Sequence, residues 1–176
     1  MRCRAANGFS MVELLVAVAI VGLLAAIAIP AYQNNVARAQ VAEALAMTGS
    51  LQAAATAVYS ETGSFPLSNA AAGAGSATSY RSRYVTSVEL MPFGFGGPNP
   101  NVHAVIIVTL GGQALPALQG LRQPLYALKT NTGALVWACG PRTHANVIDG
   151  TQGNLMVASQ VHDTIPARFK PAECRW

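Results

Sequence analysis

Residues 9–30 read FSMVELLVAVAIVGLLAAIAIP, and this stretch decides the architecture of the chain. From residue 9 to residue 29 only three residues are not apolar: Ser10, Glu13 and Gly22. No charged residue follows Glu13 until Arg38. As a helix, residues 9–29 would be about 31 Å long, which matches the hydrocarbon thickness of a bilayer. The stretch therefore predicts a helix that can span a membrane.

The rest of the 176-residue chain has the composition of a soluble domain rich in Ala, Gly and Ser. Hydrophobic residues make up 52% of the chain and charged residues 10%, which excludes disorder driven by high charge. The net charge of +4 comes from 11 basic and 7 acidic residues, too few and too scattered to indicate a nucleic-acid surface. Six basic residues could favour DNA or anionic surfaces, but we expect them to be scattered solubilising charges: Arg81, Arg83, Arg122, Arg142, Arg168 and Lys170.

The residues before the apolar stretch predict its orientation. Arg2 and Arg4 make this short segment basic, so by the positive-inside rule it stays cytoplasmic and the C-terminal part lies outside. The alternative is a conventional secretory signal, in which cleavage at Ala26-Ile27-Ala28 would leave a soluble periplasmic protein. Glu13 argues against a plain export signal, because a carboxylate costs about 2.5–3.5 kcal/mol near the centre of a lipid-exposed helix.

Glu13 needs a partner, and a cut between Gly8 and Phe9 would create one. The new α-amino group of Phe9 would carry a positive charge four residues before Glu13. In a staggered array of parallel helices, Glu13 of one subunit can face the amine of its neighbour, which favours the register that matches the two charges. The alternative is a plain membrane anchor in which Glu13 lies in the headgroup layer.

The N-terminal motif resembles that of a known family. Gly8 before the cut, Phe9 after it, Glu13 as the fifth residue of the mature chain and Pro30 closing the apolar stretch are similar to type IV pilins and pseudopilins. The resemblance implies a prepilin peptidase that cleaves after Gly8 and methylates the amine of Phe9. It also implies a homopolymer, which inner-membrane assembly machinery builds into an extracellular pilus for adhesion, twitching motility or DNA uptake.

An amphipathic pattern continues after Pro30 to about Glu61. Residues at three- and four-residue intervals predict one buried face of a helix: Ala37, Val41, Ala44, Leu45, Thr48, Leu51, Ala55, Val58 and Tyr59. Other faces carry polar residues, among them Gln40. Pro30 removes a backbone donor, so we expect a kink or local melting there. Thr62-Gly63 should end the helix, and residues 62–83 should form a surface loop with little that could join a core.

Four strands are predicted after this loop, at residues 84–90, 102–110, 125–129 and 135–139. The segments between and after them are expected to be a loop at 92–100, a hairpin turn at 130–133 and mostly loop at 140–165, with 155–158 a weaker strand candidate. Consecutive strands without intervening helices favour an antiparallel sheet, here laid over the amphipathic helix. The predicted fold is α+β. Its segments are a leader (1–8), a transmembrane and filament-core helix (9–29), an amphipathic half (30–61), a loop (62–83) and a sheet domain (84–176).

Cleavage after Gly8 would also resolve the odd count of three cysteines. Cys3 leaves with the leader, and the mature chain keeps Cys139 and Cys174, an even number in an oxidising compartment. A bond between them would close a loop of about 36 residues and contribute roughly 4 kcal/mol. Two buried thiols are the alternative. The C-terminal ending is also similar to that of type IV pilins, in which a cysteine pair bounds the loop that fixes the tail to the sheet.

Pseudopilins of type II secretion and minor pilins are the rival assignments, because they share the N-terminal motif. The resemblance implies that the major pseudopilin carries a calcium site in its C-terminal region and usually no disulfide. After Cys139 this chain has only Asp149, Asp163 and Glu173 as acids, too sparse for an obvious hard-cation cage. The cysteine pair therefore favours a pilin.

No residue pattern supports an enzyme, a metal site or a cofactor. The residues that could in principle form a triad or a metal site are His103, His144, His162, Asp149 and Asp163. No nucleophile elbow or two-ligand helical spacing accompanies them, so we expect loop or surface groups. The glycines of residues 94–97 lack a following Lys and helix, which argues against a phosphate-binding loop.

Overall fold

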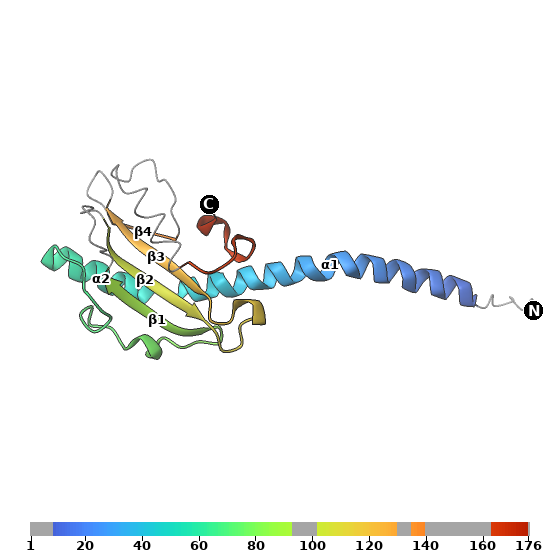
Figure 1. Ribbon diagram of the computed structural model, residues 1–176, viewed down its shortest axis with the longest axis horizontal. Helices are drawn as coiled ribbons and strands as arrows, with labels where there is room; N and C mark the ends of the chain where they lie inside the picture. The colour runs from blue at the N-terminus through green and yellow to red at the C-terminus, as the bar shows by residue number, and fades with distance from the viewer. Residues whose placement is uncertain (1–8, 93–101, 130–134, 140–162, 176) are drawn as a thin grey trace, which may run out of the picture. The chain divides into compact units, whose positions relative to one another are not determined.

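The structure is a computed structural model that describes residues 9–92, 102–129, 135–139 and 163–175 (Figure 1). The chain divides into two compact units, Met1–Val36 and Ala37–Trp176. In chain order the helices and strands are α1 (Met11–Ala46), α2 (Gly49–Thr62), β1 (Val85–Pro92), β2 (Val102–Leu110), β3 (Arg122–Lys129) and β4 (Leu135–Ala138). Short 3₁₀ helices are η1 (Ala77–Ser79), η2 (Pro116–Leu118), η3 (Ala167–Phe169) and η4 (Ala172–Cys174). The predicted α+β class is confirmed.

The first unit holds the N-terminal part of α1. The carbonyl of Ser10 accepts a hydrogen bond from the Leu14 amide at 3.2 Å, so the helix begins directly after Ser10. α1 continues through Pro30, so the local melting that the sequence allowed is not found. The kink at Pro30 stays a prediction.

The second unit begins with the end of α1 and with α2, which together form the predicted long helix from Met11 to Thr62, with a turn at Met47-Thr48. The Thr48 amide bonds the Leu45 carbonyl at 3.0 Å, and the Thr48 hydroxyl donates to the same carbonyl at 2.7 Å. In an uninterrupted α-helix the Gly49 amide would bond the Leu45 carbonyl. Here the Thr48 amide and hydroxyl occupy that carbonyl, and the backbone forms a turn at Met47-Thr48. α2 then ends as predicted, with Gly63 at φ 73° donating its amide to the Tyr59 carbonyl.

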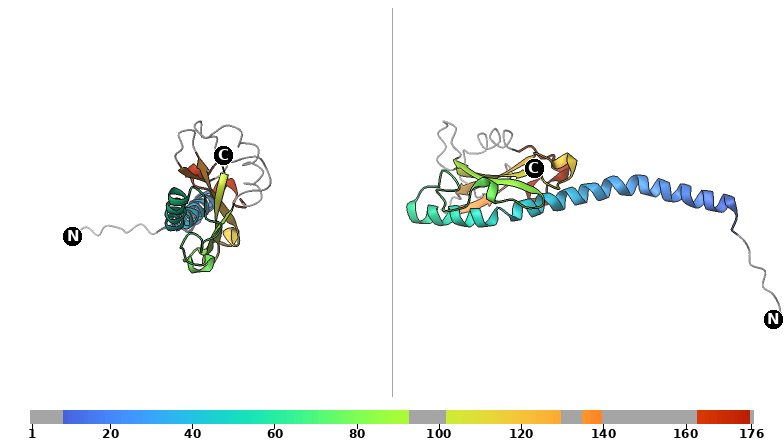
Figure 2. Two further views of the ribbon diagram at one scale, coloured as in Figure 1. Left: turned by 90° about the vertical axis from the view of Figure 1, so that its left-hand side faces the viewer. Right: turned by 90° about the horizontal axis from the view of Figure 1, so that it is seen from below.

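The sheet is an antiparallel meander in the order β1-β2-β3-β4. α2 and the last turns of α1 lie along one of its faces, as two further views show (Figure 2). Side chains that alternate along the strands join the predicted helix face in one core: Ala37, Val41, Ala44, Leu51, Ala55, Val85, Val88, Leu90, Ala104, Ile106, Val108, Leu110, Leu125 and Ala127. The indole N–H of Trp137 also donates to the Thr56 hydroxyl at 3.1 Å, which links β4 to α2.

Gln40 lies on the buried side of α1, contrary to the sequence pattern. Its side chain is 7% exposed, and its Oε1 accepts a hydrogen bond from the Leu115 amide at 2.9 Å. The spacing of apolar residues assigned Gln40 to a polar face. That spacing gives no information about Leu115, which lies 75 residues later in the chain and contacts the helix. A buried amide with a backbone partner avoids most of its desolvation cost.

β3 begins at Arg122, three residues before the predicted start. Pro124 lies within this strand although a proline cannot donate to a ladder. It pairs with Ile107 of β2, while β4 pairs only with residues 126–129 of β3. Pro124 therefore lies beyond the end of β4. Among the described residues, no strand pairs with Pro124 on the β4 side of β3.

Residues 62–83 contribute to the core, so the expectation of a plain surface loop is wrong. Asn69 is buried, and its side-chain amide donates to the Val88 carbonyl at 3.0 Å while its Oδ1 accepts from the Leu90 amide at 2.6 Å. Asn69 thus occupies hydrogen-bonding positions on the outer side of β1, as an added strand would. Phe65 stacks on Tyr59 with ring centroids 4.4 Å apart. Only tertiary contacts give these residues their role.

Several expectations fall outside the described residues. These are the leader (1–8), the loop at 93–100, the hairpin turn at 130–133 and the candidate strand at 155–158. The strands that flank the turn do pair in antiparallel fashion, with Lys129 opposite Leu135. The proposed segment boundaries stay predictions.

Candidate functional site

The N-terminal part of α1 presents an apolar surface on all sides. Every large apolar side chain from Phe9 to Ile29 is exposed, with Phe9 at 76%. The helix is long and apolar enough to cross a membrane. An apolar surface of this extent is not stable in water, so it requires lipid or other helices around it.

Glu13 is an acidic residue in the first turn of α1, three residues after Ser10. A carboxylate there interacts favourably with the positive end of the helix dipole. The sequence from Ser10 to Glu13 also fits the capping-box pattern, in which Glu or Gln at this position bonds the cap backbone. The structure places Phe9 two residues before the start of α1, while Gly8 lies outside the described residues. The pairing of Glu13 with the Phe9 amine of another subunit stays a prediction.

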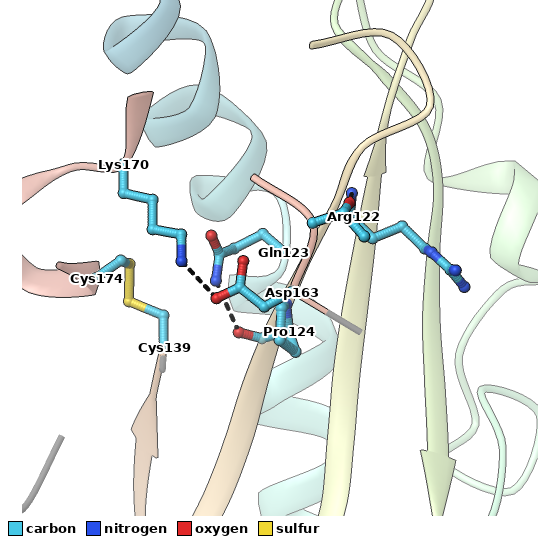
Figure 3. Close-up of polar contacts among 8 residues, drawn as sticks. Arg122, Gln123, Pro124, Cys139, Asp163, Lys170 and Cys174 are labelled. Carbon is cyan, nitrogen blue, oxygen red and sulfur yellow. Dashed lines mark hydrogen bonds and ion pairs between the residues drawn. A yellow bond between two sulfur atoms is a disulfide. The ribbon is translucent and has the colours of Figure 1, made fainter. Parts of the chain in front are cut away.

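The predicted disulfide is present between Cys139, which directly follows β4, and Cys174 in η4 (Figure 3). Their Cα atoms are 5.0 Å apart, within the range that a disulfide can span. The bond fastens the C-terminal segment to the end of the sheet, as the similarity to type IV pilins implied. The alternative of two buried thiols is not what the structure shows.

Thiol labelling of the purified precursor can verify this bond, with Cys3 as an internal control. Without reductant we expect alkylation of Cys3 alone, because Cys139 and Cys174 have no free thiol. After denaturation and reduction all three cysteines should be labelled. Peptide mass spectrometry reads each site separately, and labelling of Cys139 in the unreduced, unfolded chain would contradict the bond.

Beside the disulfide, Lys170 and Asp163 form an ion pair that the sequence did not predict. The Lys170 Nζ lies 2.6 Å from Asp163 Oδ2, and the two side chains are only 5% and 2% exposed (Figure 3). Lys170 is therefore not the solubilising charge that was expected. Asp163 lies outside the helices and strands, in a loop as expected, but its carboxylate is buried. The chain accepts the desolvation of both charges because each compensates the other.

The buried polar atoms around this pair are incompletely hydrogen-bonded among the described residues. Among the described residues, Asp163 Oδ1 and Gln123 Oε1 are buried without a hydrogen-bond partner. Burial, and secondarily the negative charge of Asp163, raises the pKa of the Tyr126 phenol above its usual range. The phenol is therefore neutral near pH 7. Removing one charge of the buried ion pair would lower the free energy of unfolding, because the other charge would stay buried without a partner.

Backbone contacts hold the rest of the C-terminal segment against the domain. The Arg122 amide donates to the Thr164 hydroxyl at 2.7 Å, and the Thr164 amide donates to the Arg122 carbonyl at 3.0 Å. The Arg38 Nε donates to the Arg168 carbonyl at 2.8 Å. The segment thus contacts both β3 and α1. No helical or strand periodicity marks Asp163 or Lys170, so only the folded structure reveals their pairing.

A long apolar N-terminal helix followed by a disulfide-closed helix-and-sheet unit defines a membrane-anchored filament subunit. Comparison with known families agrees with this class. Residues 37–175 match the pilin family, described as bacterial filament, and residues 3–29 match the prokaryotic N-terminal methylation motif. The chain belongs to the pilin family, in its type IV branch.

Individual relatives cover nearly the whole chain. It is 32% identical over 171 residues to a fimbrial protein of Neisseria meningitidis, spanning 96% of this chain and 94% of that protein. It is 34% identical over 170 residues to the type IV major pilin protein PilE of Neisseria gonorrhoeae, spanning 96% and 93%. Over 150 residues it is 34% identical to the fimbrial protein EcpC of Eikenella corrodens, spanning 84% and 91%. The protein is a structural pilus subunit, anchored in the membrane by its apolar helix before assembly.

Proposed function

We propose that a prepilin peptidase cleaves the bond between Gly8 and Phe9 and methylates the new amine of Phe9. The match of residues 3–29 to the N-terminal methylation motif supports this maturation. Cleavage removes Arg2 and Arg4, so the side-chain balance of the mature chain is 9 basic against 7 acidic residues. The two arginines also support an orientation with the N-terminus in the cytoplasm and the second unit outside.

The mature subunit polymerises through residues 9–29 into an extracellular filament. The observation that carries this proposal is the exposed apolar surface of α1, which has one carboxylate at its start. Transfer from lipid to a bundle of helices gains little from hydrophobicity alone, so close helix–helix contact must stabilise the filament core. Glu13 then selects the register by facing the Phe9 amine of a neighbouring subunit. A kink at Pro30 adjusts how the helices pack.

The sheet and loops form the outer surface of the filament, and assembly machinery in the inner membrane inserts each subunit. Adhesion, twitching motility and DNA uptake are the activities such a filament would serve. The names of the relatives, fimbrial protein and type IV major pilin, support a major pilin over a minor pilin or a secretion pseudopilin.

N-terminal analysis of the mature protein tests this maturation. Edman degradation and peptide mass spectrometry are expected to find an N-methylated Phe9 as the first residue. A start at Ile29 would instead identify a conventional signal peptide and a soluble periplasmic protein. As a matched control, Ala28→Arg removes the small residue that conventional signal cleavage needs. This variant should still be cut after Gly8.

A further inference from the structure

Arginine side chains gather at one end of the sheet. Arg122 is the first residue of β3 and pairs with Thr109, next to the end of β2. β1 starts at the same end, because Val85 pairs with Leu110. Arg83 lies just before β1, where its Nε donates to Gln113 Oε1 at 2.7 Å in the loop that follows β2. Arg83 and Arg122 therefore lie at the same end of the sheet.

Two further arginines are tied to this end. Thr164 exchanges two hydrogen bonds with Arg122 and is followed four residues later by Arg168. The carbonyl of Arg168 accepts from Arg38 Nε, which brings α1 to the same region. We call Arg38, Arg83, Arg122 and Arg168 the basic end. Arg83, Arg122 and Arg168 were expected to be scattered charges, but the fold brings them to the same end of the sheet.

Among the residues that the structure describes, no carboxylate neutralises the charge of the basic end. Arg83, Arg122 and Arg168 are exposed, and within the described residues none of the four arginines forms an ion pair. Asp163, which directly precedes Thr164 in the chain, is bonded to Lys170, and the Arg122 side chain points away from that pair (Figure 3). Arg83 and Arg168 also lie over the rings of Tyr84 and Phe169, contacts that leave their positive charge in place. The basic end therefore presents guanidinium groups that have no counter-charge among the described residues.

The connection to the membrane helix enters the second unit at this end. The unit begins at Ala37, so Arg38 is its second residue. Nine helical residues from Ile29, where the apolar stretch ends, to Arg38 correspond to about 13 Å. The field of an anionic membrane surface acts over about 8–10 Å at physiological salt, and an arginine side chain adds to that reach. The chain length therefore limits how far Arg38 can lie from the headgroups while the subunit is anchored.

We propose that the basic end docks on the phosphate groups of anionic phospholipids while the subunit is still in the membrane. Guanidinium groups suit this ligand because they bind phosphate oxygens through two parallel hydrogen bonds. Docking holds the second unit against the bilayer until the helix leaves the lipid for the filament. The proposal rests on the membrane-anchored state and does not require processing at Gly8.

Amide hydrogen exchange of the full chain in nanodiscs tests the docking. One chain per disc is prepared in phosphatidylcholine alone and in an equal mixture with phosphatidylglycerol. We expect amides of residues 111–121, the loop at the basic end, to exchange about fivefold more slowly in the anionic discs. The difference should disappear in 0.5 M salt, where the field reaches only about 4 Å. Equal exchange rates in both discs would overturn the proposal.

Two variants separate docking from general charge effects. The triple variant Arg83→Gln, Arg122→Gln, Arg168→Gln should lose the lipid-dependent slowing. Lys129→Gln, which removes one charge at the opposite end of β3, should keep it. Arg38 is left in place because its Nε supports the Arg168 carbonyl. For each variant, the exchange rates of residues 111–121 in the two kinds of disc are compared. A change that the substitution itself causes in the loop affects both rates equally and does not alter their ratio.

Two further readings complete the experiment. Unchanged protection of β2 in the triple variant shows that the sheet is folded, so that loss of slowing supports the proposal. Duplex DNA added to the phosphatidylcholine discs probes the other polyphosphate that arginines bind. Slowing by DNA without slowing by phosphatidylglycerol would assign the basic end to nucleic acid and overturn the lipid assignment.

Discussion

Replacing Glu13 with Ala is expected to leave the precursor inserted and processed but to lower the yield of assembled filament about tenfold or more. The variant leaves the positive amine of Phe9 in the helix bundle without its partner. A loss of 1.4 kcal/mol corresponds to about tenfold in subunit affinity, and an unpaired buried charge costs more than that. Sheared filament protein, measured against total pilin, is the readout.

Two variants show whether the charge of Glu13 causes this effect. Glu13→Gln keeps the size and the capping-box chemistry at the start of α1 but removes the charge, so it should also lose filaments. Glu61→Ala removes an exposed carboxylate from the last turn of α2 and should assemble normally. Normal filament yield from both Glu13 variants would exclude the charge pair and leave a plain anchor with Glu13 in the headgroup layer.

Replacing Lys170 with Met is expected to lower the free energy of unfolding of the second unit by about 3–5 kcal/mol. The variant leaves the Asp163 carboxylate buried without a counter-charge, in a site where its Oδ1 has no described hydrogen-bond partner. Chemical denaturation of the full chain in detergent, followed by tryptophan fluorescence, measures the change. The disulfide stays closed in both proteins, so their unfolded chains carry the same cross-link.

Removing both charges together should restore most of the lost stability. Lys170→Met with Asp163→Leu replaces a buried ion pair by apolar groups of similar size, which is often neutral or stabilising. Arg81→Met, at an exposed position, should change the unfolding free energy by about 0.5 kcal/mol or less. If Lys170→Met were as mild as Arg81→Met, the pair would be accessible to solvent, contrary to the structure.

Local patterns predicted the elements that depend on near neighbours in the chain. The buried helix face from Ala37 to Ala55, the stop at Gly63 and the strand at 102–110 follow from periodicity and turn chemistry. The cysteine count predicted the bond between Cys139 and Cys174. Each of these needs only residue types and spacings, which are visible in the sequence.

The errors occur where a polar side chain finds a partner far away in the chain. Gln40 bonds the backbone of Leu115, and Asn69 bonds the free side of β1. Neither partner can be read from spacing, so both residues were assigned to surfaces. The turn at Met47-Thr48 within the long helix has a local cause, because the Thr48 hydroxyl competes for a helix carbonyl.

The sequence by itself determined that this chain is a membrane-anchored pilin, because an uninterrupted apolar stretch with one carboxylate and a preceding glycine depends only on the order of residues. The tertiary structure alone decided which charged side chains are buried and which lie together at the basic end. Lys170 and Arg168 are two residues apart, yet one is buried against Asp163 and the other belongs to the basic end. Burial depends on the packing of distant segments, and a charge changes from a solubilising group to a structural one when that packing removes its water.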